Sequence, residues 1–257
     1  MTLAPLLADL AAEHDALDAV VGPIPAARWD APTPAPGWAV RHQFGHLIYF
    51  DEQATLAATD PDAFAENRDL IVANRGSFDL AGPAAALPAD EILAAWRAGR
   101  AGLLAAFVDV DPRARLPWYG PPMSARSFLT ARLMETWAHG VDVHEAVGAP
   151  VLPTARLRHV AHIGVTTRSW SYVVRGEEPP ASDVRVELDD PDGGERWTWG
   201  DEAATDVVRG AALDFCLVAT QRRAVDDTAL EVVGPAAADW MAKAQAFAGG
   251  PTATTRR

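Results

Sequence analysis

The sequence has a single cysteine and a shortage of positive charge. Cys216 has no second cysteine to pair with, so no disulfide can form within the chain. It lies in an apolar run, where we expect a buried, unreactive thiol. Only 22 lysines and arginines face 35 aspartates and glutamates, which argues against nucleic acid or an anionic membrane as a partner.

Long hydrophobic runs are also missing. No stretch approaches the ~18 uninterrupted apolar residues of a membrane-spanning helix. The first residues lack the basic start and apolar core of a secretion signal, so we expect none. Together with the lone cysteine, these absences predict a cytoplasmic protein without a membrane partner.

Apolar residues recur at three- and four-residue spacings through the first part of the chain. This spacing is typical of amphipathic helices, and it shows no alternation typical of strands. The predicted helices cover residues 3–21, 37–58, 61–74, 89–108 and 128–144, the last with Ser124 as its N-cap. We therefore predict a mainly α fold class, with an up-and-down helical bundle over residues 1–148 as the first domain.

The pattern changes after residue 148. Alternating residues at 184–188 and 196–199, around a turn, predict a β-hairpin, and residues 229–233 predict a further short strand. Helices are expected at residues 156–174, 203–220 and 236–247. We predict a small α+β domain with an antiparallel sheet over residues 149–248, followed by a disordered tail over residues 249–257.

A carboxylate and an imidazole share one face of the helix at residues 128–144. Glu135 and His139 are four residues apart, one helical turn, and this pair can bind a divalent cation. The candidate for a third metal ligand is His46 on an earlier helix, because bundles build metal sites from facing helices. His42, one turn before it, is the competitor. Asp142 is either an outer partner that orients His139 or a solvated charge.

Other interpretations of these residues stay open. A Glu and a His at this spacing often make only a surface interaction. His46 is equally compatible with a core imidazole that is hydrogen-bonded to a backbone carbonyl.

A longer pattern resembles a known family. Trp-x-Val-Arg at residues 38–41 precedes His46, and Glu-Thr-Trp-x-His follows at residues 135–139. Together these strings resemble the mycothiol-dependent maleylpyruvate isomerase family, whose N-terminal half is a DinB-like four-helix bundle. The resemblance extends to the smaller second domain, with its Trp-Thr-Trp strand at residues 197–199. It implies that His46, Glu135 and His139 hold a divalent metal.

The resemblance also implies a chemistry. Mycothiol, a low-molecular-weight thiol, would be the co-substrate of an isomerase or S-transferase acting on a small molecule, with the metal activating the thiol. Zinc suits this ligand set best, with nickel or iron as alternatives. Metal-assisted hydrolysis, which needs no thiol, and non-catalytic metal binding are the rival functions.

An acidic substrate or thiol ligand needs a cationic side chain. Arg222 is our candidate catalytic residue, at the end of the helix expected at residues 203–220. Arg223 beside it and Arg75 in the first domain are further candidates, and surface roles are open for all three.

Overall fold

The structure is a computed structural model that describes residues 2–73 and 79–250. The chain divides into two compact units, Met1–Val151 and Leu152–Arg257. Helices make up most of the first unit, and the second combines helices with a sheet. The predicted mainly α fold class is thus confirmed. Residues 251–257 of the predicted tail lie outside the described part of the chain.

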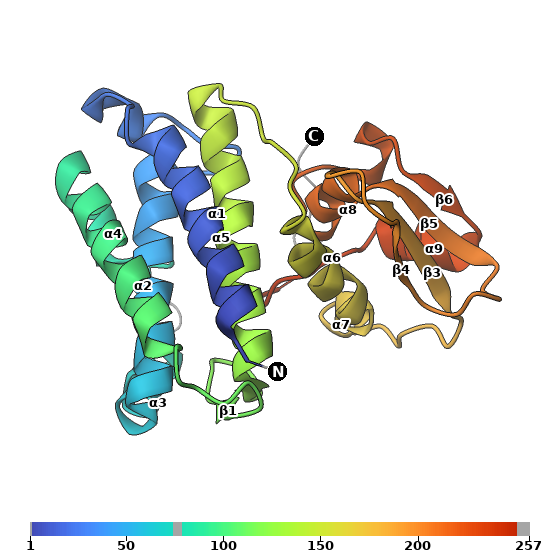
Figure 1. Ribbon diagram of the computed structural model, residues 1–257, viewed down its shortest axis with the longest axis horizontal. Helices are drawn as coiled ribbons and strands as arrows, with labels where there is room; N and C mark the ends of the chain where they lie inside the picture. Colours follow the sequence, from blue (N-terminus) through green and yellow to red (C-terminus); the bar gives the residue numbers. More distant parts are fainter. Residues whose placement is uncertain (1, 74–78, 251–257) are drawn as a thin grey trace. The chain divides into compact units, whose positions relative to one another are not determined.

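Among the described residues, four long helices of the first unit pack side by side as a bundle (Figure 1). They are α1 (Ala4–Val21), α2 (Val40–Thr59), α4 (Ala89–Ala106) and α5 (Ala125–Val147). A shorter helix, α3 (Pro61–Ala73), follows α2, and 3-10 turns lie at η1 (Ala26–Asp30) and η2 (Pro83–Ala86). Each α-helix overlaps one that the apolar spacing predicted.

The order of helix directions differs from the predicted up-and-down bundle. Arg41, at the start of α2, donates from Nη1 to the carbonyl oxygen of Leu87, just before α4 (3.2 Å). The starts of α2 and α4 therefore lie at the same end, and the two helices run parallel. The long connection over residues 60–88 returns the chain to that end, which makes this a bundle with one crossover.

Two strands in the first unit escaped the sequence analysis. β1 (Arg115–Leu116) and β2 (Met123–Ser124) pair antiparallel and are too short to show an alternating pattern. Ser124 then caps α5 as predicted, because its Oγ accepts a hydrogen bond from the backbone N–H of Ser127 (3.1 Å).

The second unit contains a mixed sheet with the strand order β4-β3-β5-β6. Its strands are β3 (Val184–Asp189), β4 (Trp197–Trp199), β5 (Asp206–Ala211) and β6 (Glu231–Val233). The predicted hairpin is present as β3 and β4, and the predicted last strand as β6. The sheet is not purely antiparallel, since β3 and β5 pair in parallel.

The helices of this unit are shorter than predicted. They are α6 (Leu157–Thr166), α7 (Arg168–Val173), α8 (Ala212–Ala219) and α9 (Pro235–Met241), with a 3-10 turn at η3 (Val225–Asp227). The expected helix at residues 203–220 is wrong in its first half, which forms β5. Val207 and Val208 favour a strand, and pairing with β3 and β6 overrides the helical tendency of the neighbouring alanines.

The part of the chain that the structure describes contains no helix long and apolar enough to cross a membrane. The bundle instead buries its apolar residues in a core between α1, α2 and α4, which includes Leu17, Phe44 and Trp96.

One titratable group lies inside this core. His14 on α1 is 1% exposed, and its ring meets that of Trp96 edge-on at 6.0 Å. Burial, with the nearby charges of Arg100 and Arg132, lowers the pKa of His14 to about 3. The imidazole is therefore neutral in the folded bundle.

This burial predicts a loss of stability in mild acid. The unfolded chain binds a proton at His14 below about pH 6.5, whereas the folded chain resists protonation until about pH 3. The free energy of unfolding should therefore fall as the pH drops through this window, by about 2 kcal/mol between pH 7 and pH 5 from this residue. Urea unfolding at both pH values measures the loss. In His14→Leu the loss should be smaller by this amount, whereas the control His144→Gln should behave like wild type, and equal losses in all three proteins would contradict the prediction.

Candidate metal centre

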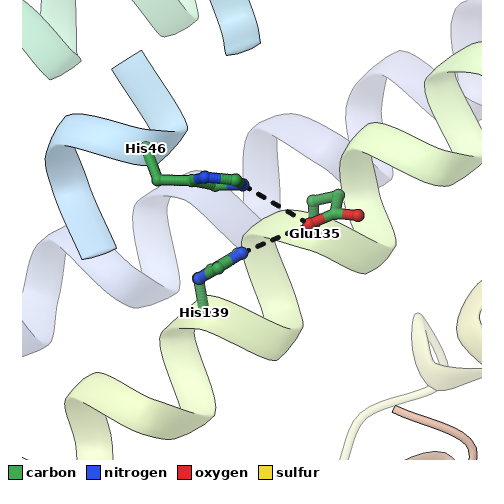
Figure 2. A group of neighbouring side chains, drawn as sticks. All are labelled: His46, Glu135 and His139. Atoms are coloured by element: carbon green, nitrogen blue, oxygen red, sulfur yellow. Dashed lines mark ion pairs between the residues drawn. The ribbon is translucent and has the colours of Figure 1, made fainter. Parts of the chain in front are cut away.

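Three side chains from two helices converge in the bundle (Figure 2). His46 comes from α2, and Glu135 and His139 come from successive turns of α5. Their ligand atoms lie within 4.8 Å of one another. The Nε2 atoms of His46 and His139 lie 3.9 and 3.2 Å from Oε2 of Glu135. The structure thus brings together the three residues that the sequence selected.

Both imidazoles point their Nε2 atoms at the carboxylate because Nδ1 is engaged elsewhere. His46 Nδ1 lies 2.8 Å from the backbone oxygen of Leu80, and His139 Nδ1 lies 2.5 Å from Oε1 of Gln43. These oxygens can only accept, so each Nδ1 carries the proton. A neutral ring in this state has its lone pair on Nε2, which is the form that binds metals.

The charge of Glu135 is stabilised in place. Burial on its own raises the pKa of this carboxyl, but its interactions with His139 and His46 hold the pKa well below its usual value. The carboxyl is therefore ionised at neutral pH, as a metal ligand must be.

The donor set and its spacing fit a divalent cation. Two ligand atoms at ~2.1 Å from one tetrahedral cation lie roughly 3.4 Å apart. The distances of 3.2 and 3.9 Å to Glu135 bracket this value. Two lone pairs directed at a carboxylate also call for a positive charge between them. Three protein ligands leave further coordination positions for water or substrate.

A buried ion pair fixes how α2 and α5 face each other beside the triad. Nε and Nη2 of Arg132 both donate to Oδ1 of Asp51, at 3.0 and 2.9 Å, and the two side chains are 3% and 1% exposed. Asp51 follows His46 by five residues, and Arg132 precedes Glu135 by three. The same pair that holds the helices in register therefore sets the distance between the ligands.

Aromatic rings lie against both histidines of the triad. The ring of Phe50 lies 4.5 Å from that of His46, and the ring of Trp38 stacks on His139 at 6.0 Å. Beyond Phe50, the hydroxyls of Tyr49 and Tyr119 lie 3.4 Å apart. Burial, and to a smaller extent the interaction with Tyr49, raises the pKa of Tyr119, so this hydroxyl keeps its proton at neutral pH.

The alternatives left open by the sequence are resolved in part. His42 is engaged as a helix cap, because its Nδ1 accepts from the backbone N–H of Ala39 (2.8 Å). Asp142 is 1% exposed, so it is not a solvated charge. His46 does bond a backbone carbonyl, through Nδ1, and this leaves its Nε2 directed at Glu135.

The predicted arginines have different outcomes. Arg222 lies in the second unit, is 8% exposed, and donates from Nη1 to the carbonyl oxygen of Thr220 (2.7 Å). Its catalytic role stays a prediction, as does that of Arg223. Arg75 lies outside the described residues.

The sequence analysis missed the groups that orient the ligands. Gln43 lies three residues before His46 and is completely buried, and a buried glutamine on a ligand-bearing helix face was a usable signal. The carbonyl of Leu80 had no such signal, because a backbone group in a loop leaves no mark on residue type.

Gly45 allows the segment that carries the Leu80 carbonyl to approach His46. A Cβ atom on Gly45 would lie 2.3 Å from the backbone oxygen of Ala81 and 2.8 Å from Ala85. The segment that carries Leu80 can approach α2 only because residue 45 has no side chain.

The first 150 residues resemble one family in particular. The family model of the mycothiol maleylpyruvate isomerase N-terminal domain matches residues 10–144. Two uncharacterized proteins of Mycobacterium tuberculosis, from strains CDC 1551 / Oshkosh and ATCC 25618 / H37Rv, are each 47% identical to this chain over 249 residues. Each match covers 96% of this chain and 96% of the relative.

Solved structures extend the similarity to the whole fold. Crystal structures of the mycothiol-dependent maleylpyruvate isomerase and of a histidine-to-alanine mutant of it match with TM-scores of 0.57 and 0.58. Each match covers 90% of this chain and 93% of the solved chain, at 17% identity. At this identity the match supports the shared fold alone.

The close approach at Gly45 yields a prediction. In Gly45→Ala the methyl group must push the Ala81 segment away, which costs about 1–3 kcal/mol in the free energy of unfolding. The Leu80 carbonyl moves with it, so zinc affinity should fall as well, by about 10-fold. Gly140→Ala is the matched control, since its Cβ would meet only Leu17 at 3.6 Å. Urea unfolding and a chelator competition with Zn²⁺ measure both effects, and wild-type values for Gly45→Ala would refute the steric argument.

Proposed function

The chain belongs to the mycothiol maleylpyruvate isomerase N-terminal domain family, and we propose that it is a metal-dependent enzyme that uses a low-molecular-weight thiol. By this proposal it binds one divalent cation, zinc first among the candidates, and takes mycothiol as its co-substrate. The reaction is an isomerisation or an S-transfer on a small molecule.

The observation that carries the proposal is the convergence of two imidazole lone pairs and one carboxylate. His46, Glu135 and His139 would hold the cation through Nε2, a carboxylate oxygen and Nε2. Two neutral imidazoles and one negative charge leave a divalent ion with a net positive charge. When bound, such an ion stabilises a thiolate and polarises a carbonyl oxygen.

The thiol in this proposal comes from outside the chain. Cys216 is the only cysteine, it is buried, and burial raises the pKa of its thiol. A protonated and inaccessible thiol cannot act as the nucleophile. In an isomerisation, the sulfur of the external thiol adds to an activated double bond, the resulting single bond rotates, and the thiolate leaves unchanged.

The surroundings of the triad support chemistry on a shielded substrate. The rings of Trp38 and Phe50 lie against the histidines and cover part of their surface, which strengthens electrostatic interactions at the site. The hydroxyl of Tyr119 keeps its proton and can donate a hydrogen bond to a substrate oxygen. Arg222 is the cation that we propose for an acidic substrate or thiol.

The metal site is tested by removing its ligands. The protein loaded with Zn²⁺ should contain about one ion per chain, and Glu135→Ala and His46→Ala should each lower the affinity by more than about 100-fold, beyond the usual cost of an outer partner. His144→Ala, on the same helix but outside the triad, is the control. Elemental analysis after dialysis measures the ion, and metal retained by both ligand variants would rule out the site.

Thiol dependence is tested separately. We expect the zinc-loaded protein to isomerise maleylpyruvate, or to transfer mycothiol to an electrophile, only when mycothiol is present, as followed by absorbance and mass spectrometry. Mycothiol should also raise the melting temperature of the zinc-loaded form and not that of Glu135→Ala. Ester or amide hydrolysis without thiol would favour a hydrolase, and metal binding with no response to thiol would favour a non-catalytic protein, so either result would overturn this proposal.

A further inference from the structure

A chain of hydrogen bonds leads from the backbone at Trp38 to the ligand His139. Thr33 Oγ1 lies 2.9 Å from the carbonyl oxygen of Trp38, and Gln43 Nε2 lies 2.9 Å from Thr33 Oγ1. Gln43 Oε1 then reaches Nδ1 of His139 at 2.5 Å. We propose that Thr33 and Gln43 are positioning residues that hold the proton of His139 on Nδ1 and keep Nε2 available as a ligand. The inference rests on the metal site of the proposed function.

The carbonyl oxygen of Trp38 determines which group donates in each of these hydrogen bonds. A carbonyl oxygen can only accept, so the hydroxyl of Thr33 donates its single proton to Trp38. That hydroxyl therefore has only acceptor capacity left for Gln43, and the group facing it is the amide NH₂. The amide oxygen consequently faces His139 and requires a proton on Nδ1.

Burial enforces this direction. The side chain of Gln43 is 0% exposed, so water cannot replace a lost partner. A rotated amide would set its NH₂ group against the protonated Nδ1 of His139 and its oxygen against a hydroxyl whose proton is committed. Each buried polar group left without a partner would destabilise the rotated arrangement.

This series of hydrogen bonds disfavours the other neutral tautomer of His139, which carries its proton on Nε2. Nε2 of His139 lies 3.2 Å from Oε2 of Glu135, so a proton moved to Nε2 would gain a charge-assisted hydrogen bond. That tautomer would occupy the lone pair that a metal needs. An acceptor at Nδ1 that cannot rotate away favours the metal-binding tautomer over the one that Glu135 draws toward itself.

Backbone contacts hold the loop that contains Thr33 in place. The backbone N–H of Thr33 also donates to the Trp38 carbonyl (2.8 Å), and Pro32 and Ala39 form a β-bridge. The same hairpin places the Trp38 ring on His139, with an angle of 21° between the ring planes. One short loop therefore sets the tautomer of the ligand and the plane of its ring. His46 differs, because the carbonyl of Leu80 orients it directly.

The experiment separates proton position from metal affinity. In Gln43→Met the acceptor at Nδ1 is lost, and zinc affinity should fall by about 10–100-fold in a chelator competition. Thr33→Val keeps the shape and removes the hydroxyl, so a smaller loss is expected. Gln43→Glu keeps an acceptor at Nδ1 but sets its second oxygen against the Thr33 hydroxyl, so its affinity should lie between those of Gln43→Met and wild type. Gln53→Met, which replaces the amide of another buried glutamine of α2, is the control and should leave the affinity unchanged.

The second measurement is ¹⁵N NMR of the His139 ring in metal-free protein at about pH 8.5, where an ordinary histidine is neutral. We expect the proton on Nδ1 in wild type and Gln43→Glu, and a signal from the Nε2–H tautomer in Gln43→Met. A wild-type tautomer and affinity in Gln43→Met would overturn the inference. A shifted tautomer in a protein that binds no zinc even as wild type would instead refute the proposed function, which keeps the two failures apart.

Discussion

The interface between α2 and α5 is the constraint on which the site depends. Asp51 and Arg132 are buried at this interface, and a buried charge is tolerated only when it is paired. Sliding one helix past the other by a turn would separate the two charges inside an apolar core. The antiparallel register is therefore fixed by a large energetic penalty. His46 and Glu135 stand within two turns of the pair, so their separation is set by the same penalty.

Loops supply further groups that contact the two histidines of the triad. One segment supplies the Leu80 carbonyl to His46, and its approach requires the missing side chain of Gly45. Another supplies the Trp38 ring and the Thr33 hydroxyl that orient His139. Nδ1 of His46 contacts a loop carbonyl, whereas Nδ1 of His139 contacts Gln43 on α2. With the proposed cation, this arrangement would pre-organise the Nε2 atoms and so reduce the cost of ordering the ligands on binding.

The family of the chain is shown by sequence similarity, whereas its reaction is our proposal. Membership follows from the match over residues 10–144 and from relatives that share 47% identity along nearly the whole chain. Those relatives are themselves uncharacterized. The thiol-dependent reaction that we propose rests on three features of the chain: a triad suited to a divalent cation, aromatic rings against its histidines, and a lone cysteine that is buried and cannot serve as nucleophile.

Sequence patterns were sufficient to predict the helices of the bundle and to select three residues that the structure brings together. Apolar spacing identifies helices because one face of each is buried, and the string over residues 135–139 with the upstream His46 predicted the triad, whose ligand atoms lie within 4.8 Å of one another. The spacing failed at β5, where pairing with β3 and β6 makes a strand from part of a segment expected to be helical. Three features became visible only in the folded structure: the crossover between α2 and α4, the burial of Asp51 with Arg132, and the contact of Gln43 with His139. These features depend on contacts between residues distant in the chain, some of them backbone groups, and local patterns carry no record of such contacts.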